Sequence, residues 1–111
     1  MRDTARAATA PLTVRVLDVG QGDATLITNG GSRVLVDGGP SMARMGELLD
    51  SLHLNDSTID VVVLTHQHLD HLGGLRELFR TRRRIRVRFF FENRDVYAGT
   101  SLAQLRDSVN A

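Results

Sequence analysis

Residues 59–71 read IDVVVLTHQHLDH, an apolar run that ends directly in a cluster of polar side chains. An apolar run of this length, rich in β-branched residues, is typical of a strand buried on both faces of a sheet. Three of the four histidines in the chain lie in the last six of these residues, together with an aspartate. Imidazole and carboxylate are ligands that zinc, iron and manganese accept. We therefore predict a metal site at the end of a buried strand, with His66, His68, Asp70 and His71 as ligands.

The spacing of these four side chains allows two metal ions. His66 and His68 are two residues apart, so an extended backbone puts both on the same side. Asp70 and His71 are adjacent and point apart, so one pair can serve one ion while the other pair reaches a second. The alternative is a loop with four polar surface residues. Structural histidines rarely gather in this way, because each packed neutral imidazole needs its own partner.

The flanking segments predict alternating strands and helices. Asn29-Gly30-Gly31 favours a tight hairpin turn, because Asn and Gly tolerate the positive φ of such turns. Ser41 is expected to cap a helix whose apolar face runs to about Leu52. Predicted strands cover residues 12–18, 24–28, 32–36, 59–65 and 85–91, and predicted helices cover residues 42–52, 75–79 and 101–109.

This order of elements predicts an α/β fold with a mixed sheet and helices packed on a face. In the first strand, Leu12, Val14 and Val16 alternate with more polar residues, so we expect them to form one well-buried face. In the last strand, Phe89 and Phe91 are expected on one side of the sheet.

The composition is typical of a soluble globular domain, with 41% hydrophobic and 24% charged residues among 111. The net charge of +1 gives no global argument for nucleic acid or a membrane surface, and the absence of cysteine excludes thiolate metal sites. No stretch approaches the ~20 apolar residues that cross a bilayer, so a soluble and, by default, cytoplasmic chain is expected. Residues 1–11 are interpreted as a disordered leader or linker, and residues 12–111 as a partial domain.

Three blocks of sequence resemble a known family. THQHLDHLGG at residues 65–74 resembles the His-x-His-x-Asp-His motif of the metallo-β-lactamase superfamily. LDVGQGDA at residues 17–24 and VLVDGG at residues 34–39 are similar to the start of the metallo-β-lactamase domain of ComEC/Rec2-type competence proteins. The blocks occur in the family's order, and the resemblance covers roughly residues 13–91.

The resemblance implies the first half of the metallo-β-lactamase αβ/βα sandwich and a metal-dependent hydrolase that uses metal-bound hydroxide. It assigns His66 and His68 to one ion and Asp70 and His71 to the other, normally Zn²⁺, with manganese or iron as alternatives. Asp70 would also be catalytic, by orienting the attacking water or accepting its proton. Asp37 would support the histidine loop without binding metal, since such a carboxylate fixes a ligand's ring and tautomer. A similar supporting role is assigned to Asp18, whose alternative is a plain tight turn.

The chain departs from the family in its downstream ligands. The complete fold uses later histidines and a bridging carboxylate, yet no histidine follows His71. The chain therefore looks truncated, and the isolated chain is expected to be nearly inactive. The sheet is expected to keep an uncovered apolar face, which a second half-domain or a dimer partner would cover. The alternative function is a non-catalytic metal-binding or interaction fragment of the same fold.

A run of arginines follows the histidine motif. Arg82, Arg84 and Arg86 are predicted to bind phosphate, because guanidinium groups suit bidentate phosphate contacts. This cluster and the competence-type blocks favour a phosphodiesterase or nuclease with nucleic acid as its substrate. The alternative is a solvated helix end and strand face, and a β-lactam or thioester hydrolase of the same fold is a further possibility.

Overall fold

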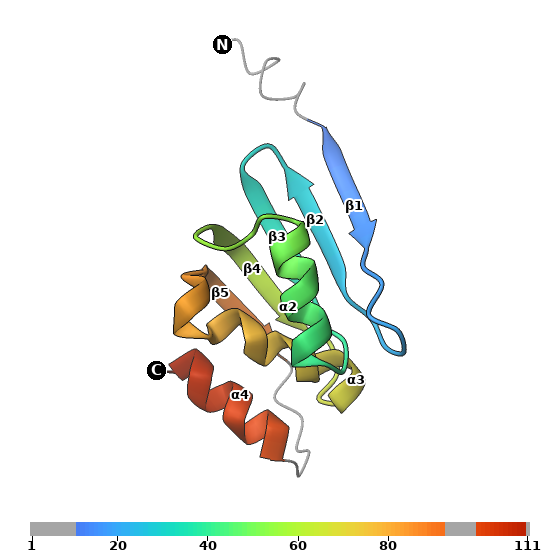
Figure 1. Ribbon diagram of the computed structural model, residues 1–111, viewed down its shortest axis with the longest axis vertical. Helices are drawn as coiled ribbons and strands as arrows, with labels where there is room; N and C mark the ends of the chain where they lie inside the picture. Colours follow the sequence, from blue (N-terminus) through green and yellow to red (C-terminus); the bar gives the residue numbers. More distant parts are fainter. Residues whose placement is uncertain (1–10, 93–99, 111) are drawn as a thin grey trace.

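One mixed sheet organises the computed structural model, which describes residues 11–92 and 100–110. The strands lie side by side in chain order, β1 to β5 (Figure 1). Strands β1, β2 and β3 are antiparallel neighbours, and β3, β4 and β5 are parallel ones. Residues 1–10 of the predicted leader lie outside the described residues. The strands are β1 (Leu12–Val16), β2 (Thr25–Asn29), β3 (Ser32–Val36), β4 (Thr58–Leu64) and β5 (Arg86–Glu92).

Helices make the two parallel connections and lie on one side of the sheet (Figure 1). Helix α2 (Met42–Ser51) joins β3 to β4 and begins at Ser41, whose Oγ accepts a hydrogen bond of 3.1 Å from the backbone N–H of Arg44. The predicted mixed α/β fold is therefore confirmed. The other helical elements are α3 (Leu69–Leu72), the 3₁₀ segments η1 (Gly73–Phe79) and η2 (Thr81–Arg83), and α4 (Thr100–Asn110).

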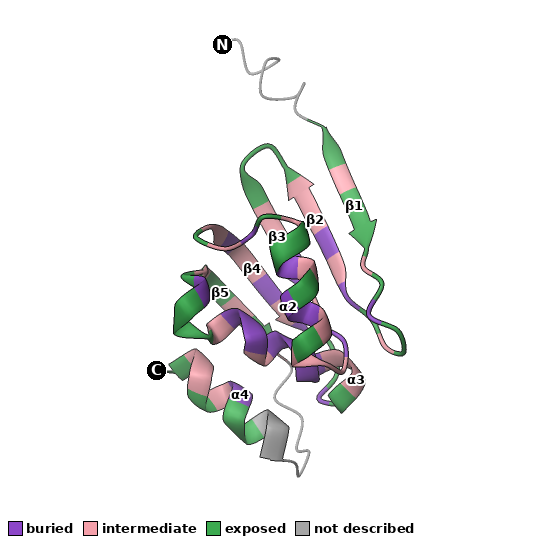
Figure 2. Cartoon of the chain, viewed as in Figure 1, coloured by how far each residue is buried: buried purple, intermediate pink, exposed green. Residues whose placement is uncertain are grey.

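The core lies between the helices and the covered face of the sheet. Leu26, Leu35 and Val62 stand opposite one another on adjacent strands, and all three are buried (Figure 2). Helix α2 packs on η1, and α4 packs on η1 and α3. The helical side chains that complete this core are Met45, Leu49, Leu72, Leu75, Leu78 and Leu105.

The opposite face of the sheet is apolar and lacks a covering element among the described residues. The predicted burial of Leu12, Val14 and Val16 was wrong, since these side chains are 67%, 59% and 79% exposed. Burial of β4 on both faces was also wrong, because Val61 and Val63 are only half-buried there. Two cross-strand rows form this bare face: Val14, Ile27, Val34, Val61 and Phe89, and beside it Val16, Thr25, Val36, Val63 and Phe91.

None of the helices in residues 11–92 and 100–110 combines the length and the hydropathy that crossing a lipid bilayer requires.

Candidate metal centre

The histidine loop lies where two neighbouring parallel strands end. Asp37 follows β3, and residues 65–71 follow β4. Parallel strands end at the same edge of a sheet, so both segments meet there. The backbone N–H of Asp37 donates to the carbonyl of Val63 at 2.8 Å, and that of Gly38 donates to the carbonyl of His71 at 2.7 Å. These backbone hydrogen bonds alone hold Asp37 beside the histidine loop.

The buried carboxylate of Asp37 connects both ends of this loop. Its Oδ1 accepts from the backbone N–H of Thr65 at 2.8 Å, and its Oδ2 accepts from the Thr65 hydroxyl at 2.6 Å. The same Oδ2 lies 2.9 Å from Nδ1 of His71. Because this contact occupies Nδ1, Nε2 is the His71 nitrogen that remains available to a metal ion.

Two carboxylates approach the Nε2 atom of His71. Asp70 Oδ1 lies 3.7 Å from it and Asp23 Oδ2 lies 3.9 Å from it. The His66 ring lies beside His71, with 4.7 Å between ring centroids, and the His68 ring lies 6.1 Å from that of His66. The His71 side chain is 14% exposed and that of Asp70 is 39% exposed, so solvent reaches the carboxylate more readily than the ring. The loop therefore gathers nitrogen and carboxylate donors at an accessible surface.

The donor set fits a divalent transition metal. Asp37, His66 and His71 each offer a ligand atom, and these atoms lie within 4.8 Å of one another. Imidazole nitrogen and carboxylate oxygen are ordinary ligands of zinc, manganese and iron. Both oxygens of Asp37, however, already accept hydrogen bonds. Three of the four lone-pair sites of this carboxylate are thus engaged, so the geometry favours Asp37 as the acceptor that orients His71.

The loop between β1 and β2 covers part of the histidine loop. The carbonyl of Asp23 accepts from the backbone N–H of Gly39 at 3.0 Å. A Cβ atom on Gly22 would lie 2.1 Å from the carbonyl oxygen of Asp70, so glycine permits this close approach. Asp23 was not predicted as a site residue. The signal available in the sequence was its position directly after the glycine loop.

Asp18 contacts its own turn and helix α2. Its Oδ1 accepts from the backbone N–H of Gly20 at 3.3 Å, and its Oδ2 lies 3.9 Å from the guanidinium of Arg44. Its carboxylate is 88% exposed. These contacts describe a capped turn and an exposed ion pair, and the predicted support of the metal loop by Asp18 stays a prediction.

The arginine run lies at the other edge of the sheet. Arg86 stands opposite Thr58 at the start of β4, six residues before its end, which corresponds to about 20 Å along the strand. Arg84 is paired with Asp56, and Arg82 lies 3.4 Å from a carboxylate oxygen of Glu77. Their predicted phosphate binding stays a prediction, and these contacts supply no link to the histidine loop.

Arg83, in the same run, is buried. Its Nε donates to Glu77 at 2.7 Å, and its Nη1 donates to Asp50 and Asn55 at 3.0 Å each. The side chains of Arg83 and Glu77 are both 3% exposed. Arg83 therefore holds elements of the fold together and does not face solvent.

Comparison with known proteins agrees with this geometry. Residues 17–84 match the family model of the metallo-β-lactamase superfamily. The chain is 39% identical over 79 residues to the atrochrysone carboxyl ACP thioesterase of Aspergillus fumigatus, covering 64% of this chain and 25% of the relative. It is 41% identical over 66 residues to recombination protein 2 of Haemophilus influenzae, covering 55% of this chain and 8% of the relative, which confirms the competence-type resemblance.

The solved metallo-β-lactamase FIM-1 from Pseudomonas aeruginosa, in its mono-zinc form, is similar over 88% of this chain and 41% of its own, at 17% identity and a TM-score of 0.47. The chain spans a quarter or less of the length of the thioesterase and of recombination protein 2. With its family match over more than half of its length, the chain belongs to the metallo-β-lactamase superfamily, a family of metal-dependent hydrolases.

Proposed function

We propose that this chain forms the histidine-loop half of a two-metal hydrolase that cleaves phosphodiesters, with Zn²⁺ as its metal and manganese or iron as alternatives. The observation that carries the proposal is the contact between Asp37 and Nδ1 of His71, which turns Nε2 towards Asp70. A ring held in this way is prepared to bind a cation through Nε2.

The residues divide the work by position. His66 and His68 would hold one cation, and Asp70 and His71 a second one. Bound divalent cations supply Lewis acidity, which polarises a substrate oxygen and lowers the pKa of water. Asp70, at 39% exposure, would orient the attacking water and accept its proton. Asp37 keeps the His71 ring in place while the charge at the site changes.

Phosphodiesters are proposed as the substrate because the chain is similar to a recombination protein and because its arginine run was predicted to bind phosphate. The chain is 41% identical over 66 residues to recombination protein 2, so a nucleic-acid substrate is the first candidate. The second candidate is thioester hydrolysis, favoured by 39% identity over 79 residues to a carboxyl ACP thioesterase. Both reactions need an activated water and a stabilised oxyanion, so the same loop could serve either.

The bare sheet face is proposed to receive a second half-domain. No histidine follows His71 in the 111 residues, so further histidine ligands would have to come from elsewhere. The two apolar rows of the bare face are continuous across all strands from β1 to β5. A half-domain with its own apolar sheet would cover these rows and could bring ligands to the edge where the histidine loop lies. The isolated chain is therefore expected to turn over substrate very slowly.

Metal binding and hydrolysis by the purified chain test this function together. Co²⁺ and Zn²⁺ titration would be followed by parallel assays with bis(p-nitrophenyl) phosphate, single-stranded DNA and an acyl thioester. Asp70→Asn should weaken metal binding and abolish the residual turnover, whereas His53→Asn, at the one histidine outside the loop, should change neither. Thioester turnover alone would support the second candidate. Metal binding without turnover, even with a second half-domain added, would favour a non-catalytic module, and no metal binding would refute the proposal.

A further inference from the structure

Gln67, between His66 and His68, is buried, although both of these histidines are exposed. Gln67 is 2% exposed, and its Nε2 donates to Oε1 of Glu92 at 3.4 Å. A buried carboxamide needs hydrogen-bond partners, because leaving one unmade costs the desolvation of that group. The hydrogen bond from Gln67 thus links the segment from His66 to His68 to Glu92.

Glu92 ends strand β5 at the same edge of the sheet as the histidine loop. It stands opposite Leu64, the last residue of β4, and its side chain is only 9% exposed. Its carboxylate is thus held against the first residues of the loop and has little access to water. A carboxylate in such a place needs a cation or several donors to remain charged.

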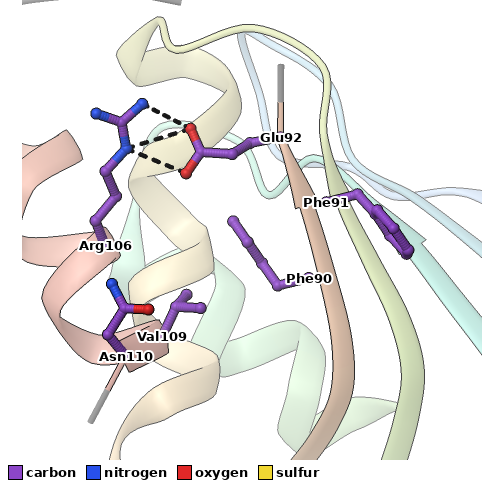
Figure 3. Close-up of a pocket in the computed structure, with 6 residues that line it drawn as sticks. All are labelled: Phe90, Phe91, Glu92, Arg106, Val109 and Asn110. Atoms are coloured by element: carbon purple, nitrogen blue, oxygen red, sulfur yellow. Dashed lines mark hydrogen bonds and ion pairs between the residues drawn. The ribbon is translucent and has the colours of Figure 1, made fainter. Parts of the chain in front are cut away.

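Arg106 on helix α4 supplies that cation. Its Nη2 donates to Oε1 of Glu92 at 2.7 Å, and its Nε donates to Oε2 at 3.1 Å, a two-pronged contact visible in Figure 3. The hydrogen bond to Glu92 raises the pKa of Arg106 above its ordinary value, so the guanidinium of Arg106 stays charged. Two parallel contacts fix the direction of the carboxylate as well as its position.

Apolar side chains pack against one side of the pair, and Asn110 lies nearby. Phe90 and Val109 lie below the pair and line a cavity of about 240 Å³, while Phe91 points to the other side of β5 (Figure 3). Phe90 also meets Phe79 edge to face, with 6.4 Å between ring centroids. Because Glu92 is only 9% exposed and both of its oxygens accept from Arg106, a change in Arg106 is felt directly by Glu92.

We propose that Arg106 and Glu92 are positioning residues of the metal loop. The ion pair fixes Gln67, and Gln67 in turn sets the spacing of His66 and His68. Helix α4 is then part of the metal centre, although its described side chains contribute no ligand. This inference rests on the proposed metal site. The rival explanation is that the pair only fastens α4 to β5.

A double-mutant cycle on the Co²⁺ dissociation constant separates the two explanations. Gln67→Met and Arg106→Gln should each weaken Co²⁺ binding by about tenfold, as loss of an outer hydrogen-bond partner does. If Arg106 acts through Gln67, the double variant should bind Co²⁺ about tenfold more weakly than the parent chain, as each single variant does. The second substitution then adds nothing, because it removes the same interaction. Arg84→Gln, which removes the pair with Asp56 at the opposite edge, should stay within twofold of the parent chain. The inference would be overturned if the double variant bound Co²⁺ about a hundredfold more weakly, the product of the two single effects. An unchanged Co²⁺ affinity in Arg106→Gln would also overturn it.

Spectra of the metal-free chain give an independent readout. The ¹H–¹⁵N imidazole signals of His66 and His68 should move in Arg106→Gln and return towards the parent positions in Arg106→Lys, with Arg84→Gln as the unmoved control. Unmoved signals in a folded Arg106→Gln variant would refute the positioning role. If Arg106→Gln fails to fold, Gln67→Met carries the same comparison. Absent Co²⁺ binding by the parent chain would refute the proposed function, while these spectra would still decide the inference.

Discussion

Replacing Gly22 with alanine should displace Asp70 and weaken metal binding. A Cβ atom at this position would lie 2.1 Å from the carbonyl oxygen of Asp70, whereas such contacts are essentially never closer than 3.0 Å. The difference of 0.9 Å must be taken up by the loop that carries the ligands. Overpacking of this kind costs about 1–3 kcal/mol. The φ of +102° adds backbone strain of about 1–3 kcal/mol for any residue with a side chain.

Gly20→Ala is the matched control for this experiment. Gly20 has a φ of +77° in the same loop, but nothing lies within 4 Å of the position that a Cβ atom would take there, so only the backbone strain applies. Urea denaturation of the metal-free variants should show Gly22→Ala less stable than Gly20→Ala by about 1–3 kcal/mol, the part due to the clash. Co²⁺ titration should show weaker binding in Gly22→Ala alone. Equal stability and equal Co²⁺ affinity in the two variants would refute the idea that this loop positions Asp70.

Three further perturbations test the fold. Arg83→Met should reduce the free energy of unfolding by about 3–5 kcal/mol, because the buried carboxylate of Glu77 loses its main partner; a loss under about 1 kcal/mol in urea denaturation would contradict this. Phe89→Ser on the bare face should change the free energy of unfolding by less than about 1 kcal/mol. The same substitution should reduce self-association measured by light scattering. A loss of several kcal/mol, as expected for a core residue, would mean that the face is covered. The hydrogen bond from Arg84 lowers the pKa of Asp56 below 3.8, so the pair stabilises the fold above about pH 4 and this contribution is lost as the pH falls through the lowered pKa. The difference in melting temperature between the parent chain and Asp56→Asn should therefore be present at about pH 6 and disappear in strong acid, and a difference independent of pH would show that the pair is not its source.

The fold was predictable wherever local sequence decides it. The turn at Asn29-Gly30-Gly31 lies between β2 and β3 as expected, and Ser41 caps α2 as expected. The first strand shows the limit of this reasoning. Alternation in Leu12, Val14 and Val16 marks which face is apolar, but whether another element covers that face depends on parts of the fold far away in sequence.

The proximity of the proposed ligands and of Asp37 could be predicted from the sequence, whereas the approach of Asp23 could not. His66, Asp70 and His71 lie within six residues of the chain, so their proximity needs little tertiary information. The approach of Asp23 depends on contacts between the β1–β2 loop and residues 39 and 70, which are distant from it in sequence. Neither interpretation of the arginine run placed Arg83 inside the fold, because a run of charge gives no sign of a buried partner such as Glu77.

The closeness of the predicted ligands along the chain has a consequence for thermodynamic linkage. Because His66 to His71 span only six residues, the unfolded polypeptide keeps most of the donors that the native loop offers. Folding adds the restraint from Asp37, which is 34 residues away from His71 and reaches it only when β3 and β4 are paired. A cation that also binds the denatured ensemble raises the melting temperature less than its native affinity implies. The gain in melting temperature with added Zn²⁺ would thus report the contribution of Asp37 more directly than that of the histidines themselves.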